Sequence, residues 1–184
     1  HLIQLGHRRI AYIGQDPDFD ENPNVRYVEE QRLAAYTDTL MAHGIPVHDA
    51  LIAFGWHYRL QAHRYTGDGC RLTDRLLGLE ERPTAMFAAS DILAMGALQS
   101  IHAHHLWVPG DISLIGFDDT YAPFLAPPLT TVRLPMSELG RAAARIAIDL
   151  IDRLEDDGSI EQPVRTETLR TEFVIRASTG PAPR

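Results

Sequence analysis

The sequence predicts an α/β protein built on a doubly wound parallel sheet. Four short apolar runs alternate along the chain with segments of helical periodicity, an order typical of parallel strands joined by right-handed crossovers. Each run is apolar almost throughout, as in strands that helices cover on both faces. The predicted strands are residues 10–13, 51–54, 85–89 and 112–117.

The segments between these strands carry apolar residues at the spacing of one helix face. Gly44, followed by Ile45-Pro46, is a stop signal for the first helix, and either Ser90 or Asp91 can cap the third. Extended runs flank the last helix on both sides. The predicted helices are residues 31–43, 70–79, 91–101 and 136–154, and the extended runs are residues 129–132 and 171–176.

The composition indicates a soluble globular domain. The 184 residues are 45% hydrophobic and 23% charged, and the net charge of −8 excludes a protein that grips nucleic-acid backbones with its own surface. No apolar run approaches the ~20 residues that cross a bilayer, and the first ten residues lack a secretory-signal pattern. Because Cys70 is the only cysteine, no internal disulfide can form, and a cytoplasmic location without membrane contact is expected.

Polar residues and glycines follow each predicted strand at the point where it ends. In open parallel sheets, ligands bind beyond the carboxyl ends of the strands, so these residues are expected to gather at one edge and to form a ligand site. The strand tips are Gly14-Gln15-Asp16, Gly55-Trp56-His57, Ser90-Asp91 and Asp118-Asp119.

No motif predicts an enzyme, a metal site or a cofactor. The Gly-x-Ser-x-Gly pattern is absent, and the Gly-Asp-Gly at 67–69 lacks the lysine and hydroxyl residue of a phosphate loop. His102 and His105 lie three apart on a predicted helix, but no third ligand is placed near them, so a solvated helix face is the preferred interpretation.

Four segments in order resemble the LacI/GalR family of bacterial transcription regulators, and the resemblance runs from His1 to about Thr179. Members of that family resemble two-lobed periplasmic binding proteins that follow a helix-turn-helix domain. The segments are HLIQLGHRRIAYIG, RPTAMFAASDILAMGAL, VPGDISLIGFDD and PPLTTVRLPMSELGRAA.

The resemblance implies a periplasmic-binding-protein-like (type I) lobe with most of the N-terminal lobe missing. Residues 1–128 are then the C-terminal lobe, residues 129–160 a crossover strand and helix that complete the missing lobe, and residues 161–184 the return strand and tail. Glycine commonly follows the last residue of a helix, and Gly6 is expected to end a helix of which only a few residues precede it. This expectation fits a chain that begins within a fold. The apolar face of the 136–154 helix is expected to fold back or to pair with a second chain, so a homodimer is predicted.

The resemblance places effector contacts at Asp118 and Arg32. A carboxylate beyond a strand tip can accept hydrogen bonds from two neighbouring sugar hydroxyls, although it can also cap a turn. Asp119 is expected to serve the turn. Arg32 matches the arginine that opens the first helix in the family, although an exposed helix arginine is the simpler alternative. Arg26 matches, more loosely, a second arginine used by some members.

Trp56, His57 and Ser90 complete the predicted ligand contacts. An aromatic face suits the apolar face of a sugar ring, but Trp56 can equally cover the core, in which case His57 faces the ligand. Ser90 stands where the family commonly has asparagine, and a helix cap is its alternative role. The segments at 15–31 and 57–69 are longer than is usual in the family, which suggests a large or unusual effector.

The predicted function is therefore effector sensing in a LacI-type regulator, with a sugar or related metabolite as the effector and DNA bound only through a domain outside these residues. Because half of the expected cleft is missing, the chain alone is expected to bind effector weakly or not at all. The alternative is a secreted solute-binding protein of a transporter, which a signal peptide upstream in place of a helix-turn-helix would identify. An enzyme on a doubly wound sheet is the third alternative.

Overall fold

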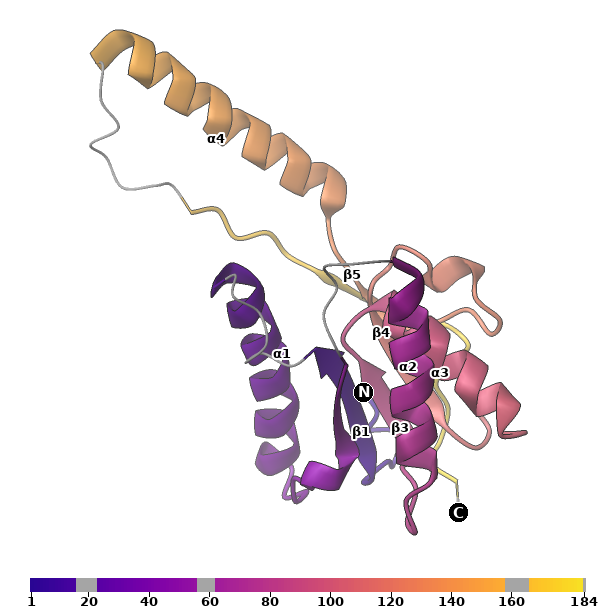
Figure 1. Cartoon of the computed structure of the whole chain (residues 1–184). Helices are drawn as coiled ribbons and strands as arrows, with labels where there is room; N and C mark the ends of the chain where they lie inside the picture. Colours follow the sequence, from indigo (N-terminus) through magenta and orange to yellow (C-terminus); the bar gives the residue numbers. More distant parts are fainter. Residues whose placement is uncertain (16–22, 56–61, 158–165, 184) are drawn as a thin grey trace. The chain divides into compact units, whose positions relative to one another are not determined.

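A computed structural model describes residues 1–15, 23–55, 62–157 and 166–183 (Figure 1). The chain divides into two compact units. The first contains residues 1–132 and 173–184, and the second contains residues 133–172. The chain thus returns to the first unit with its last twelve residues, after the segment that forms the second.

A six-stranded sheet forms the centre of the first unit, with the strand order β2-β1-β3-β4-β5-β6. The pairs β1–β2, β1–β3 and β3–β4 are parallel, which confirms the predicted α/β class and sheet type. The strand order reverses direction at β1, so the switch point of the sheet lies between β1 and β3. The strands are β1 Ile10–Gln15, β2 Ile52–Gly55, β3 Ala85–Ala88, β4 Ser113–Asp118, β5 Thr130–Arg133 and β6 Glu172–Val174.

Helices cover both faces of this sheet. Figure 1 shows α1 on one face and α2 with α3 on the other. The helices are α1 Pro23–Ala42, α2 Ala62–Leu77 and α3 Asp91–Ala103, with short 3-10 turns η2 at Asp49–Leu51 and η3 at Ala122–Phe124. The continuous apolar character of the strands follows from this sandwich, because side chains on both faces of β1 and β3 are buried.

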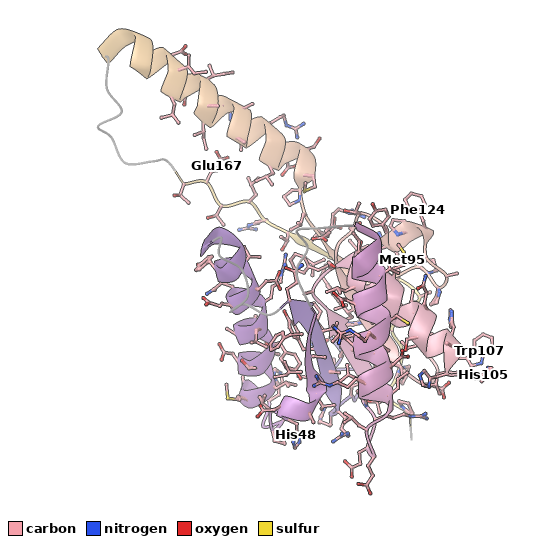
Figure 2. All side chains as sticks on the ribbon, in the orientation of Figure 1. His48, Met95, His105, Trp107, Phe124 and Glu167 are labelled. Atoms are coloured by element: carbon pink, nitrogen blue, oxygen red, sulfur yellow. The ribbon has the colours of Figure 1, made fainter. Side chains whose placement is uncertain are left out.

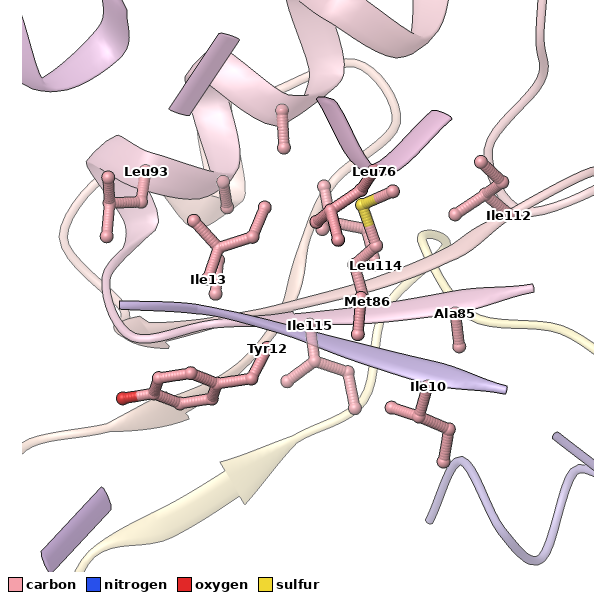
Figure 3. Close-up of a cluster of buried hydrophobic side chains, with 14 of the residues drawn as sticks. Ile10, Tyr12, Ile13, Leu76, Ala85, Met86, Leu93, Ile112, Leu114 and Ile115 are labelled. Atoms are coloured by element: carbon pink, nitrogen blue, oxygen red, sulfur yellow. The ribbon is translucent and has the colours of Figure 1, made fainter. Parts of the chain in front are cut away.

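The core lies between the sheet and the helices (Figure 3). Ile13, Met86 and Leu114 from three neighbouring strands are fully buried and pack with Leu76 of α2 in one apolar cluster. On the α1 side, the ring of Tyr12 packs against Tyr36, with 5.4 Å between ring centroids. Burial of this apolar surface is the main force that fixes the layers.

Two helices begin eight residues earlier than predicted, at Pro23 instead of residue 31 and at Ala62 instead of residue 70. The prediction for α2 was wrong because Gly67 and Gly69 argue against a helix by intrinsic propensity. Tertiary packing overrides that propensity: a Cβ at Gly69 would lie 2.2 Å from the backbone oxygen of Leu93 in α3, so glycine is what allows the two helix backbones to touch.

The second unit contains α4, Met136–Asp157, and the extended residues 166–172. Two ion pairs join its parts: Arg133 Nη1 lies 2.8 Å from Glu172 Oε2, and Arg145 Nη2 lies 3.2 Å from Glu167 Oε1. The apolar side chains of α4 that remain exposed are Met136, Leu139, Ile148 and Ile151. Across the described ranges, no helix combines the length and the apolarity needed to cross a membrane.

Candidate ligand site

The backbone is left-handed at Asp118, the last residue of β4, and at Asp119, which follows it. The φ angle is 108° at Asp118 and 61° at Asp119. Aspartate tolerates this region better than most residues, yet such a conformation still costs about 1–3 kcal/mol. Asp119 forms an ion pair with Arg176, whose Nη2 lies 2.7 Å from Asp119 Oδ1. The role of Asp119 in the turn stays a prediction.

The Asp118 carboxyl has an unusual environment at the carboxyl edge of the sheet. Its pKa is raised from 3.8 to about 6, first because burial disfavours the charged form and then because Asp91 and Glu29 are near, while Arg32 acts in the opposite direction. Asp118 is therefore partly protonated near neutral pH. A ligand that donates hydrogen bonds to this carboxylate will favour the ionised form.

Arg32 reaches the same edge from α1. Its Nη1 donates a 2.7 Å hydrogen bond to Glu29 Oε1, and its Cζ lies 4.5 Å from the centroid of the Phe117 ring. Phe117 directly precedes Asp118 in β4. The structure thus brings Arg32 and Asp118 together, as the sequence predicted, and their role as ligand contacts stays a prediction.

Glu29 is a further residue of this group, which the sequence analysis missed. It is buried and accepts hydrogen bonds from Arg32 and from the backbone N–H of Gln15. Burial raises the pKa of Glu29, and the two hydrogen bonds and the charge of Arg32 oppose that rise. Glu29 and Arg32 are spaced i, i+3, so the pair would have been visible had the helix been extended back to Pro23.

Tyr12 lies under this group, in the middle of β1. Figure 3 shows its hydroxyl pointing away from Ile10, in the direction of the strand's carboxyl end. A Cβ at Gly14 would lie 2.4 Å from Tyr12 Cε1 and 2.6 Å from its hydroxyl oxygen, so only glycine at position 14 leaves room for the ring. The hydroxyl is fully buried and has no hydrogen-bond partner within the described part of the chain, and burial raises its pKa so that it stays protonated.

The sequence left open whether Ser90 or Asp91 caps α3, and the structure gives the two residues different roles. Ser90 is the N-cap of α3: its Oγ accepts a 3.2 Å hydrogen bond from the Leu93 N–H. Asp91 is buried and accepts hydrogen bonds from the backbone of Tyr121 and Ala122 and from Thr131 Oγ1, at 2.8 Å. Asp91 therefore holds the turn after β4 against β5, and it does not cap its helix.

Three predicted contacts receive no structural description. Trp56 and His57 lie outside the described residues, and Arg26 lies in the first turn of α1 with its side chain outside the description. Each of them stays a prediction.

The histidines near the end of α3 face away from the sheet. His102 and His105 are exposed, and Figure 2 shows His105 and Trp107 projecting together from the loop that follows the helix. His104 Nε2 lies 3.1 Å from Asp74 Oδ1. This loop precedes β4 and so belongs to the opposite edge of the sheet from Asp118.

The comparison with protein families agrees with this geometry. A family described as a periplasmic binding protein-like domain matches residues 1–179. The chain belongs to this family. Periplasmic-binding-protein-like domains of LacI-type regulators are similar to it in sequence and in structure, so the predicted resemblance to LacI/GalR regulators is confirmed.

Two curated relatives show the extent of the similarity. The transcriptional regulator CelR of Thermobifida fusca is 35% identical over 179 residues, which are 96% of this chain and 46% of CelR. The regulator GalR of Escherichia coli is 35% identical over 153 residues, which are 83% of this chain and 40% of GalR. The chain thus spans about half the length of the curated relatives it matches, and both of these relatives are named as transcriptional regulators.

A solved structure extends the similarity to three dimensions. The complex of the transcriptional regulator CelR with cellobiose matches with a TM-score of 0.73 and 34% identity, and the match covers 96% of this chain and 48% of that one. The periplasmic-binding-protein-like fold predicted from the sequence is therefore confirmed.

Proposed function

We propose that this chain is the effector-sensing part of a LacI-type transcriptional regulator, and that it binds a polyhydroxylated small molecule at the carboxyl edge of its sheet. The observation that carries the proposal is the convergence of Asp118 and Arg32, from β4 and α1, beyond the strand ends. The similarity to a CelR structure that contains cellobiose supports a sugar as the effector.

The chemistry of the two side chains suits a sugar. The Asp118 carboxylate can accept hydrogen bonds from two neighbouring hydroxyls, and charged acceptors form the stronger bonds. Arg32 uses one Nη1 hydrogen on Glu29 and keeps further N–H groups for ring or hydroxyl oxygens. Trp56, His57, Arg26 and Ser90 are the further predicted contacts, with Trp56 supplying an aromatic face for the C–H face of the ring.

The proposed mechanism is allosteric. Residues 129–160 would contribute a crossover strand and helix to a second lobe, and the effector would bind between the lobes. Because an effector shifts an equilibrium only by its difference in affinity for the two states, it must bind one interlobe arrangement more tightly. In a homodimer, that shift would alter the spacing of DNA-binding domains attached outside these residues, and so change operator binding.

The test is a thermal-shift screen of mono- and disaccharides on the complete gene product, followed by titration calorimetry. Asp118→Asn keeps the shape of the side chain and removes its charge, so the affinity for the best sugar is expected to fall about 10- to 100-fold. Asp111→Asn is the matched control, because Asp111 accepts a hydrogen bond from the Trp107 N–H at the opposite edge. Equal affinities of the wild type and Asp118→Asn would contradict the proposal.

A further inference from the structure

Among the side chains that the structure describes, two arginines lie at the carboxyl edge, and both are already paired with carboxylates. Arg32 pairs with Glu29 at 2.7 Å, and Arg176 pairs with Asp119 at 2.7 Å. Glu29 and Asp119 are both nearly inaccessible to solvent, so bulk water and salt screen these pairs little. Neither arginine therefore presents a full positive charge to a ligand.

Two further carboxylates lie at the same edge without a direct ion pair in the described ranges. Asp91 is buried and is bound only by backbone N–H groups and a threonine hydroxyl. The charged form of Asp118 is favoured by Arg32 and disfavoured by Asp91 and Glu29. The described side chains at this edge thus carry an excess of negative charge.

We infer that Glu29 determines the class of the ligand: it holds the Arg32 guanidinium against the Phe117 ring and cancels its charge, so that the site takes neutral polyhydroxylated molecules and rejects sugar phosphates and sugar acids. Arg32 acts here as a fixed array of hydrogen-bond donors. A planar guanidinium that is clamped on one edge by a carboxylate and on one face by an aromatic ring loses little freedom when its remaining N–H groups meet a ligand.

The geometry of Glu29 supports a built-in role over an accidental contact. A buried carboxylate is unfavourable unless it is paired, and Glu29 is fastened both to Arg32 and to the backbone N–H of Gln15 at the end of β1. Its second oxygen, Oε2, is buried with no partner among the described residues. A buried carboxylate that contacts both Arg32 and the end of β1 fits a role in setting the charge of this edge.

The inference rests on the proposed function, and its test separates the two. Binding of the neutral sugar that gives the largest shift in the screen is compared with binding of its 6-phosphate and its uronic acid, at pH 8 and low salt, on the complete gene product. The wild type is expected to prefer the neutral sugar at least about tenfold. Glu29→Gln keeps an acceptor for Arg32 and removes the charge, so the ratio of anionic to neutral affinity is expected to rise about tenfold.

Glu30→Gln is the matched control, because it makes the same charge change on the exposed side of α1 and should leave the ratio unchanged. If no sugar of either charge binds the folded wild type, the proposed function itself fails. If the wild type prefers an anionic sugar, or if Glu29→Gln and Glu30→Gln give the same ratio, the role of Glu29 is wrong while sugar sensing stands. The wild-type comparison decides the ligand class even if Glu29→Gln does not fold.

Discussion

The two edges of the sheet both contain buried polar groups. The amino edge has a satisfied network around His7, although Arg9 Nε is also buried there without a described partner. At the amino edge, His7 is fully buried and both of its ring nitrogens are bound, Nδ1 to Thr84 Oγ1 at 2.9 Å and Nε2 to Ser113 Oγ at 3.0 Å and to the Gly180 oxygen at 3.1 Å. At the carboxyl edge, the Tyr12 hydroxyl and Glu29 Oε2 are buried without partners in the described ranges.

The difference distinguishes a region that stabilises the fold from a region suited to ligand binding. Buried polar groups are almost always hydrogen-bonded, so a satisfied network is what a purely structural region requires. A region that leaves polar atoms unmatched and holds Asp118 at a φ of 108° gives up stability for another purpose. We interpret the amino edge as the part that stabilises the domain and the carboxyl edge as the part that binds a ligand.

The largest expected effect is the loss of the His7 ring. Because a carbonyl can only accept, Nε2 carries the hydrogen for Gly180, and Nδ1 accepts from the Thr84 hydroxyl. His7→Ala leaves these groups buried and unmatched, so the free energy of unfolding is expected to fall by about 2–4 kcal/mol in urea denaturation. A loss under 0.5 kcal/mol would remove the distinction between the two edges.

A smaller effect is expected from removing one hydroxyl at each edge. Ser178 Oγ donates a 2.6 Å hydrogen bond to the Leu114 oxygen and accepts one of 2.8 Å from the Thr130 N–H, so Ser178→Ala should cost about 1–3 kcal/mol. Tyr12→Phe removes a buried hydroxyl that has no described partner and should be neutral or stabilising. Urea denaturation of both variants checks the contrast, which fails if Tyr12→Phe is the costlier change.

At the carboxyl edge, one substitution should increase stability. Asp118→Gly relieves the left-handed backbone and removes a half-buried carboxyl, so the unfolding free energy is expected to rise by about 1–2 kcal/mol in the absence of ligand. The same variant should lose sugar binding. A decrease in stability would show that Asp118 holds the turn and is not kept for a ligand.

The smallest effect is a pH dependence of opposite sign at the two edges. Because the pKa of Asp118 is raised in the folded state, the folded protein binds this proton more tightly than the unfolded chain does. The resulting contribution to the free energy of unfolding is present below pH 4 and is lost as the pH rises through about 6. The change amounts to about 1 kcal/mol between pH 5 and 7. Burial lowers the pKa of His7 below 6.5, so its contribution is present above 6.5 and is lost as the pH falls through the lowered value.

Unfolding curves of Asp118→Asn and His7→Gln from pH 4.5 to 8 separate these two contributions. The wild type gains stability from Asp118 on acidification, and Asp118→Asn should not show this gain. The wild type loses stability at His7 on acidification, and His7→Gln should not show this decrease. Parallel pH profiles for the wild type and Asp118→Asn would contradict a raised pKa at this carboxyl.

The sequence predicted the sheet and one edge of it because these depend on local patterns. The apolar runs before Asp118 and around Tyr12 specify strands by their composition, and parallel order places all strand tips at one edge. Arg32 could be assigned to that edge only through the resemblance to a known family, since a helix arginine has no local signal of its own.

The remaining features depend on partners that are distant in the sequence. Asp91 binds Thr131, forty positions further on, so its role could not be separated from helix capping by local pattern. Glu29 was read as loop because charged residues without apolar periodicity precede Arg32. The unpartnered hydroxyl of Tyr12 could not be predicted, because Tyr12 lies within an apolar run and an aromatic residue there is expected to be a core residue.

The return of the last residues to the first unit has a biosynthetic consequence. Residues near the carboxyl terminus accept or donate hydrogen bonds at the amino edge: the Leu114 N–H donates to the Ser178 oxygen at 2.8 Å, and the Ala182 N–H donates to the Leu5 oxygen at 2.9 Å. A growing chain that has reached residue 170 still lacks them. The first unit therefore completes its hydrogen bonding only after residues 178–182 have been synthesised.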